Sequence, residues 1–483
     1  MRIIGNDEIT ARKVQAVASG ALASGDTVIV NADGTVSVVA LASQAVGTAV
    51  VFEPSSSRTI GSTFDSTNNR IVVGYRDQGN SNYGTVVVGS VSGSSITFGT
   101  PVVFESDFVA DVIPTHDVNA NKVVISYRDI PNSQYGTAVV GTVNASNNSI
   151  SFGSKVIFNS SGYTSVMAAV YDATAQKIVI AWQDGGNQAH GTAIVGTVSG
   201  TSISFGSKVV FNSAVASAIS CAYDSNSSKV VITYGDDGNS IYGTAIVGTV
   251  SGTGISFGSE AVFESAAVNF TKATFDSTNN KIVVAYGDAA NSNYGTAAVG
   301  TVSGTSISFG APVVFETTNV TQASIAFDST NSKVIISYND ADNSNYGTVI
   351  SGTVSGTGIS FDTALVFEAA NTTFTATTFD SNSNKVVISY RDGGNSNYGT
   401  SIVYTPSSSN LTSENFVGIS SNGYATGQAA TINVKGFIDD NQSSLTAGQS
   451  YFVQTNGDLG LTAGSPSVFA GTAVSATKLI VKG

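Results

Sequence analysis

Residues 75–85 have the sequence YRDQGNSNYGT, and closely similar stretches begin at six later positions. They begin at Tyr127, Trp182, Tyr234, Tyr286, Tyr338 and Tyr390, at intervals of 52 residues with a single interval of 55. A fixed period of this length indicates a repeat architecture, in which each copy is one supersecondary unit that packs on its neighbours. The chain therefore contains seven copies of one structural unit.

The composition favours strands and excludes several kinds of partner. Charged residues make up 11% of the chain, and the repeats are rich in Val, Ile, Thr, Phe and Tyr, which suit a pleated, half-buried surface. The net charge is −13 and no run of Lys or Arg occurs, so we expect no nucleic-acid partner. No apolar stretch is long enough to span a membrane and the N-terminus lacks the apolar core of a signal peptide. We therefore expect neither membrane insertion nor signal-dependent export.

The fifth repeat, residues 273–316, shows how one unit is built. Four apolar clusters, which we name strands a to d, are separated by the turn-rich sequences DSTNN, DAANSN and SGTS. In strand b, residues 282–286 are apolar on both faces, which predicts a sheet covered on both sides. The sequence therefore predicts an all-β fold, a seven-bladed β-propeller in which four-stranded sheets are arranged radially.

The two ends of the repeat array predict how the ring closes. The seventh repeat stops after strand c at Thr405, whereas the other six end in a d strand of the type VVFE, and VVFE occurs at 50–53 before the first a strand. We predict that strand 50–53 completes the seventh blade, because closure removes exposed sheet edges. The propeller would span 47–405, between small β modules at 1–46 and 406–483.

The two flanking segments resemble each other. Residues 22–34 align without gaps on residues 445–457, and each contains a strand, turn, strand pattern. They are either two related modules or two halves of one module assembled by the chain ends.

The repeat pattern FDS(T/N)xNKVVIxYxDxxNSxYGTAxVGTVSGTSISFGxxVVFE is followed by a tail that contains SSLTAGQSYFVQTNGDLGLTAG. Together they resemble repeat proteins encoded by tailed phages and related marine genomes, which are regarded as virion structural or fibre-like components. The resemblance covers nearly the whole chain and its tail is the more specific part. It implies a virion location, in a tail fibre or on the capsid, and supplies no catalytic motif.

Arginine follows the anchor aromatic residue in three repeats only, as Arg76, Arg128 and Arg391. These are repeats one, two and seven, which are neighbours in a closed ring. Three guanidinium groups on one sector could bind a carboxylated or sulfated sugar through paired hydrogen bonds. The alternative is a local ion pair between each arginine and the aspartate that follows it, which would be Asp77, Asp129 or Asp392.

Alternating strand directions would place the b–c and d–a connections on one face of the ring and the a–b and c–d turns on the other. The d–a connections, which we predict to be loops, differ most among the repeats: SSSRTIGS, SDFVADVIP, SSGYTSVMA and AAVNFTKA. Divergent loops on a constant scaffold favour a binding face.

Other reactive residues favour structural roles. Each b–c loop has an Asp-x-x-Asn pattern, as at Asp77 and Asn80, which provides too few oxygens for calcium and suits a turn. His116 and His190 stand where other repeats carry aromatic residues, and Cys221 lies in an apolar stretch that suggests a small buried hydrophobe. We predict no metal, no cofactor and no enzymatic activity, since no catalytic motif is present.

These observations favour a phage virion structural protein whose propeller contacts host-surface glycan. The terminal modules would bind other virion proteins and the protein would act as a homo-oligomer on the particle. Two alternatives stay open. The first is a polysaccharide-cleaving propeller enzyme, since carboxylates that act as a pair cannot be paired from sequence. The second is a capsid decoration protein with no ligand.

Overall fold

The computed structural model describes residues 12–464 and 466–482. The chain forms two compact units: residues 45–406, and a second unit that combines the segments up to residue 44 and from residue 407. In the described residues, strands are joined by turns and by the short 3-10 helices η2 (Gly185–Asn187), η3 (Asp237–Asn239) and η4 (Ala289–Asn291). Among those residues there is no α-helix, and so no helix that could cross a membrane.

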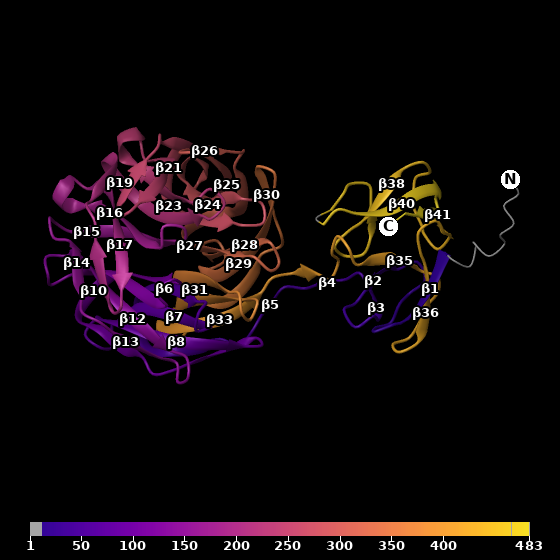
Figure 1. Ribbon diagram of the computed structural model, residues 1–483, viewed down its shortest axis with the longest axis horizontal. Helices are drawn as coiled ribbons and strands as arrows, with labels where there is room; N and C mark the ends of the chain where they lie inside the picture. Colours follow the sequence, from indigo (N-terminus) through magenta and orange to yellow (C-terminus); the bar gives the residue numbers. More distant parts are fainter. Residues whose placement is uncertain (1–11, 465, 483) are drawn as a thin grey trace, which may run out of the picture. The chain divides into compact units, whose positions relative to one another are not determined.

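The larger unit contains the seven repeats, each of which forms an antiparallel sheet (Figure 1). The b strands are β7 (Arg70–Asp77), β11 (Lys122–Asp129), β16 (Lys177–Asp184), β20 (Lys229–Asp236), β24 (Lys281–Asp288), β28 (Lys333–Asp340) and β32 (Lys385–Asp392). The c strands are β8 (Tyr83–Ser92), β12 (Tyr135–Asn144), β17 (His190–Ser199), β21 (Tyr242–Ser251), β25 (Tyr294–Ser303), β29 (Tyr346–Ser355) and β33 (Tyr398–Thr405). A short strand pairs with the end of each c strand in repeats one to six: β9 (Ser95–Phe98), β13 (Ser149–Phe152), β18 (Ser202–Phe205), β22 (Gly254–Phe257), β26 (Ser306–Phe309) and β30 (Gly358–Phe361).

The d and a strands are joined, and the prediction of d–a loops is wrong for six of the seven junctions. Each long strand pairs first with the c strand of one repeat and then with the b strand of the next, as β10 does with β8 and β11. The long strands are β6 (Val50–Asp65), β10 (Val102–Asp117), β19 (Val209–Asp224), β23 (Ala261–Asp276), β27 (Val313–Asp328) and β31 (Leu365–Asp380). Only between β14 (Val156–Asn159) and β15 (Thr164–Asp172) does the strand break. Backbone pairing on two successive sheets overrides the turn-forming residues of these segments.

The last repeat takes its outermost strands from the N-terminal side of the first. Val50 and Val51 of β6 pair with Ser401 and Thr400 of β33, and β5 (Ala45–Val46) pairs with the end of the same strand. In Figure 1 the orange β33 accordingly lies beside the indigo β6. The two ends of the repeat array are thus joined by backbone hydrogen bonds.

The core lies between neighbouring repeats. Residues 282–286 of β24 are fully buried. Those at 282, 284 and 286 pack against Val231 and Ala245 of the preceding repeat, and those at 283 and 285 pack against Val334 and Ile336 of the next. The prediction that strand b is covered on both faces is confirmed. The second residue of each c strand is glycine because a phenylalanine ring lies on it: a Cβ at Gly243 would be 2.5 Å from the ring of Phe263.

A tyrosine–glutamate hydrogen bond recurs at the junctions between repeats. The hydroxyl donates to a carboxylate in the pairs Tyr75–Glu53 (3.0 Å), Tyr127–Glu105 (2.8 Å), Tyr234–Glu260 (2.8 Å), Tyr286–Glu264 (2.9 Å), Tyr338–Glu316 (2.8 Å) and Tyr390–Glu368 (3.0 Å). At the remaining junction Trp182 stands in place of the tyrosine and Asn159 in place of the glutamate. In five of these pairs the glutamate ends the d-strand pattern and satisfies a buried hydroxyl. Tyr234 donates instead to Glu260, since Asn212 occupies the pattern position in its case.

The smaller unit is built by both ends of the chain. One five-stranded sheet has the order β1 (Lys13–Val17), β36 (Ala429–Asn433), β35 (Phe416–Ser420), β2 (Thr27–Val30), β3 (Val36–Val38). The other has the order β37 (Ile438–Asp439), β41 (Lys478–Val481), β40 (Val468–Ser475), β38 (Ser450–Val453), β39 (Leu459–Gly460), and β34 (Ser408–Ser409) pairs with β4 (Leu41–Ala42). Ile29 and Val39 share a core with Val453 and Leu479. The sequence left open whether the two flanks form two modules or two halves of one. The described residues of both flanks form one unit. The part of the predicted 1–46 module before residue 12 lies outside them.

Candidate functional site

The a strands of six repeats line a cavity of about 280 Å³ in the larger unit. Each of these strands carries one extra residue at a register shift, as β10 does between Ala110 and Ile113, where two residues face a single residue of β11. The extra residues line the cavity, where Ile60, Val112, Met167, Ile219, Phe270 and Phe374 provide apolar surface. Bulges of this kind redirect side chains away from the sheet face. The cavity therefore owes its lining to a backbone irregularity that recurs in every repeat.

The three arginines predicted from the sequence lie on β7, β11 and β32, each opposite an a strand near its register shift. Arg128 makes an ion pair with Asp111, 3.0 Å between Nε and Oδ2, with both side chains about a quarter exposed. Asp111 also lines the cavity. The guanidinium group of Arg76 lies 5.0 Å from the centre of the Phe108 ring.

A fourth arginine joins them. Arg58 of β6 pairs directly opposite Arg76 in the sheet, and its guanidinium group lies 6.0 Å from the ring of Phe374, which lines the cavity. Arg58 also donates from Nε to Gln78 Oε1 at 3.1 Å. We name Arg58, Arg76, Arg128 and Arg391 the arginine cluster.

Beyond the effect of burial, the positive charges of the cluster lie close enough together to lower the pKa values of Arg76 and Arg391. Burial lowers the pKa of Arg76, and the positive charges of Arg58 and Arg128 lower it further while Asp111 opposes them. Burial followed by the charge of Arg58 lowers the pKa of Arg391. Burial raises the pKa of Asp111, against the effect of Arg128 and then of Arg76. Arg76 and Arg128 thus share the carboxylate of Asp111, while the charge of Arg58 acts on both Arg76 and Arg391.

The alternative of local pairing is wrong, because no predicted arginine makes an ion pair with the aspartate that follows it among the described residues. Those aspartates build turns instead. Asp77 Oδ1 accepts hydrogen bonds from the backbone N–H groups of Gly79 and Asn80, and Asp392 Oδ1 does the same in its own b–c turn. The prediction of a turn role for these aspartates is confirmed.

Two arginine nitrogens are left available. Nε of Arg76 and Nε of Arg391 are both buried and donate to no partner among the described residues. A buried donor without a partner is costly, and such groups are uncommon unless they serve a ligand or a water. The cluster can therefore offer hydrogen bonds to an anion in addition to its charge.

Lys272 adds a positive charge to the cavity itself. It projects from β23 into the cavity lining, and burial lowers the pKa of its ammonium group. The lining therefore combines apolar surface with one carboxylate that is already committed to Arg128 and one unpaired ammonium group. No second carboxylate among its lining residues could act with Asp111 as an acid–base pair.

The b–c turns and the d–a segments lie on the same face, as predicted: Ser55 Oγ of the d–a segment donates to Asp77 at 2.8 Å. On the other face, Arg70 of an a–b turn donates to Asn148 of a c–d turn at 2.6 Å. His116, predicted to fill an aromatic position, instead lies 3.1 Å from Asp65 through Nε2. Its role is therefore polar as well as steric.

Arg58, Asp111 and Lys272 were not singled out by sequence reasoning. All three lie in d–a segments, whose low similarity between repeats prevents a position-by-position comparison. The signal that was available is the charge of Arg58, which is the single charged residue of the segment SSSRTIGS.

No model of a known protein family matches the chain, and a search of curated proteins finds no match either. Among solved structures, the BP39L lectin from Burkholderia pseudomallei is similar over 74% of this chain and 99% of its own, with a TM-score of 0.55 and 10% identity. AofleA from Arthrobotrys oligospora (71% of this chain and 92% of its own, TM-score 0.42, 10% identity) is more distant. So is the SapL1 lectin in complex with alpha methyl fucoside (66% and 98%, TM-score 0.40, 11% identity). The first similarity shows an all-β fold of the lectin β-propeller type, and it shows the fold alone.

Proposed function

We propose that the protein binds an acidic saccharide on a host surface, through the arginine cluster and the adjoining cavity. The repeats would form a seven-bladed β-propeller closed by strand 50–53, flanked by a small β module from the two chain ends. The observation that carries the proposal is the gathering of arginines from repeats seven, one and two beside a cavity with apolar walls.

The chemistry of the cluster suits a carboxylated or sulfated sugar. Guanidinium groups hold carboxylate and sulfate oxygens through paired, charge-assisted hydrogen bonds. Phe374 and Phe270 offer apolar surface for the less polar face of a sugar ring. The lectin with a similar fold supports a saccharide as the ligand class, although its sequence is only 10% identical.

We propose further that the protein is a component of a phage particle, in a tail fibre or on the capsid. The terminal module would attach it to other virion proteins, and several copies would act together. Weak contacts repeated over many copies give avidity without a tight single site. The resemblance of the repeat and the tail to phage-encoded proteins supports this setting.

Titration of the full chain with acidic and neutral oligosaccharides tests the binding proposal. Arg76→Gln and Arg391→Gln are suitable variants, because Gln183 occupies the equivalent position in repeat three and the fold accepts it. Lys281→Gln, at the start of a b strand beside the a–b turn, is the matched control with the same change of charge. One guanidinium contact with an anion contributes about 1.5–3 kcal/mol, so each arginine variant should weaken binding about tenfold or more.

The alternatives predict other results. A cleaving enzyme would release shorter products from the acidic polysaccharide, and a ligand-free decoration protein would retain none of the saccharides. Equal binding by the arginine variants and Lys281→Gln would contradict the assigned site. The virion setting is tested separately, by a cryo-EM map of the phage particle in which the protein must be present.

A further inference from the structure

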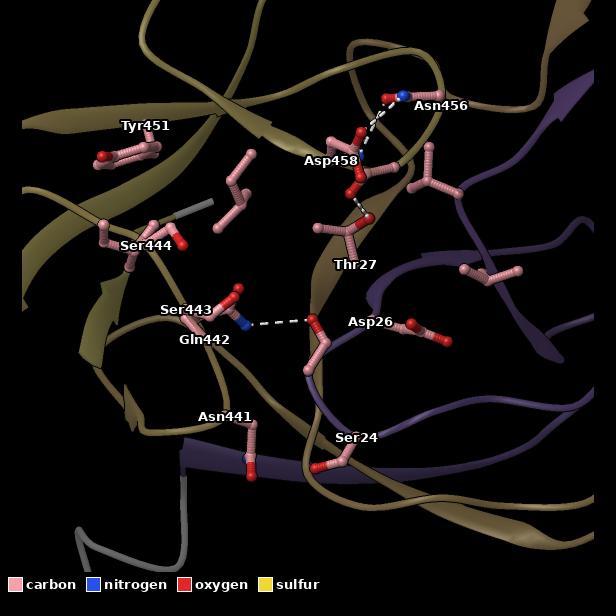
Figure 2. Close-up of a pocket in the computed structure, with 16 residues that line it drawn as sticks. Ser24, Asp26, Thr27, Asn441, Gln442, Ser443, Ser444, Tyr451, Asn456 and Asp458 are labelled. Carbon is pink, nitrogen blue, oxygen red and sulfur yellow. Dashed lines mark hydrogen bonds between the residues drawn. The ribbon is translucent and has the colours of Figure 1, made fainter. Parts of the chain in front are cut away.

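A groove with a volume of about 490 Å³ lies in the terminal unit, apart from the arginine cluster. One wall is the turn before β2, residues 24–27, with Val38 and Val39. The other wall comes from residues 441–445, Tyr451 and the turn 456–459 (Figure 2). Each wall thus carries one of the two similar segments of the chain, since β2 and β38 fall at equivalent positions in 22–34 and 445–457.

Hydrogen bonds between the walls fix their separation. Thr27 Oγ1 donates to the carbonyl of Gly457 at 2.7 Å, and Gln442 Nε2 donates to the carbonyl of Gly25 at 3.1 Å. The hydroxyl of Tyr451 accepts from the N–H of Thr446 at 2.9 Å, which holds the ring at the side of the groove. A ligand would therefore meet a preformed site, which lowers the entropy cost of binding.

Several polar groups in the groove keep unused hydrogen-bonding capacity. Within residues 12–464 and 466–482, the hydroxyls of Ser24, Ser443 and Ser444 make no hydrogen bond. Asp26 uses Oδ2 to accept from the N–H of Ala23, and Asp458 uses Oδ2 to accept from Asn456, so each has a second carboxylate oxygen available. The groove offers both donors and strong acceptors.

The charge of the lining excludes anions. The described lining contains the carboxylates of Asp26 and Asp458 and no Lys, Arg or His. A phosphate, a sulfate or an acidic sugar would be repelled, whereas the vicinal hydroxyls of a neutral sugar can donate to carboxylates and accept from serine hydroxyls. Leu445, Leu459 and Val39 add apolar surface for the C–H groups of the same ligand.

We infer that this groove is a second saccharide-binding site, which takes a neutral sugar. It does not rest on the proposed function of the repeats, because its residues, its charge and its ligand class all differ from those of the arginine cluster. Sites of different charge on one chain would let it recognise a surface that carries both kinds of glycan, with an effective affinity higher than either site alone provides.

The experiment uses the full chain against immobilised neutral oligosaccharides of glucose, galactose, mannose and fucose. Ser443→Trp should fill the groove and reduce retention on the recognised sugar at least tenfold. Ser413→Trp introduces the same side chain at an exposed serine of the same unit that is not part of the groove, and it should bind as the unmodified protein does. Asp458→Asn, which removes a charge with little change of shape, should also weaken binding.

The outcomes are distinct. Loss of neutral-sugar retention in Ser443→Trp and Asp458→Asn, with retention by Ser413→Trp and Lys281→Gln unchanged, supports the site. Failure to retain any neutral sugar, or equal retention by Ser443→Trp and Ser413→Trp, overturns it. A calcium titration that saturates at the groove while no sugar binds also overturns it. Loss of acidic-sugar binding in Arg76→Gln alone concerns only the arginine cluster, so the two proposals fail independently.

Discussion

Closure of the repeat array depends on Phe52, and we expect its removal to open the ring locally. Phe52 is 5% exposed, its ring centroid lies 5.2 Å from that of Tyr75 and 5.6 Å from that of Phe98, and it covers Gly399 of β33. Truncation of such a buried ring to alanine costs about 3–5 kcal/mol. Phe52→Ala should therefore weaken the contact between β6 and β33 by this amount.

The position of Phe52 along the chain makes the loss of stability specific to the contact between β6 and β33. A hairpin joins β17 to β19 through β18, so contacts at Phe211 link segments that are already close along the chain. The strands β6 and β33 are instead separated by most of the repeat array, and their separation releases more chain entropy. Phe211 has the same environment, 5% exposed with ring centroids 5.2 and 5.8 Å away, and Phe211→Ala is the matched control.

Hydrogen exchange measured by mass spectrometry can separate the two variants. A loss of about 3–5 kcal/mol in the local opening free energy should speed exchange in β33 and in residues 45–56 by about two to three and a half powers of ten. Phe211→Ala should speed exchange around β17 and β19 and leave β33 protected. Unchanged exchange of β33 in Phe52→Ala, or equal acceleration of β33 in both variants, would refute the reasoning.

Three further substitutions probe charged groups. Burial, with a contribution from Asp392, raises the pKa of Glu368 above 4.5, so stability should fall as pH rises from about 4.5 through the folded-state pKa; Glu368→Gln should flatten this slope in urea unfolding, and an unchanged slope would contradict the assignment. Burial alone would raise the pKa of Asp65, but the contacts of its carboxylate with His116 and Asn68 outweigh burial, and the pKa is lowered. His116→Phe should therefore cost about 1.5–3 kcal/mol at neutral pH, and equal stability of the variant would show that the contact is unimportant. Arg58→Ser should raise the unfolding free energy by about 0.2–1 kcal/mol, because it removes a pair of like charges, while it weakens retention of acidic saccharide; a loss of stability with unchanged binding would contradict both expectations.

The regular part of the fold could be predicted from the period and the alternation of apolar residues. In the fifth repeat the turn sequences DSTNN and DAANSN predict strand b between them and strand c after them, and these strands form β24 (Lys281–Asp288) and β25 (Tyr294–Ser303). The d–a segments could not be predicted, because their Ser, Gly and Asn residues are turn formers while their hydrogen-bond partners lie on two different sheets. The register shifts inside them leave no trace in the hydrophobic pattern.

The candidate sites were predictable to different degrees. Comparison between repeats was sufficient to select Arg76, Arg128 and Arg391, because the repeats provide their own reference for what is ordinary at that position. Asp111 could not be selected in this way, because its d–a segment differs too much from those of the other repeats to be compared with them. The groove in the terminal unit was beyond sequence reasoning, since it forms only when strands from the two chain ends pair, as Val28 does with Gly418.

The energetics of the arginine cluster argue for a binding role. Like charges directly opposite one another on neighbouring strands destabilise a sheet, and Arg58 faces Arg76 in this way. The equivalent pairs in repeats three and four, Ser165 with Gln183 and Ser217 with Gly235, carry no charge, so the scaffold does not require one. A group that lowers stability and is not needed by the fold is best explained by an interaction absent from the isolated chain, and an anionic ligand would relieve the repulsion between these two guanidinium groups.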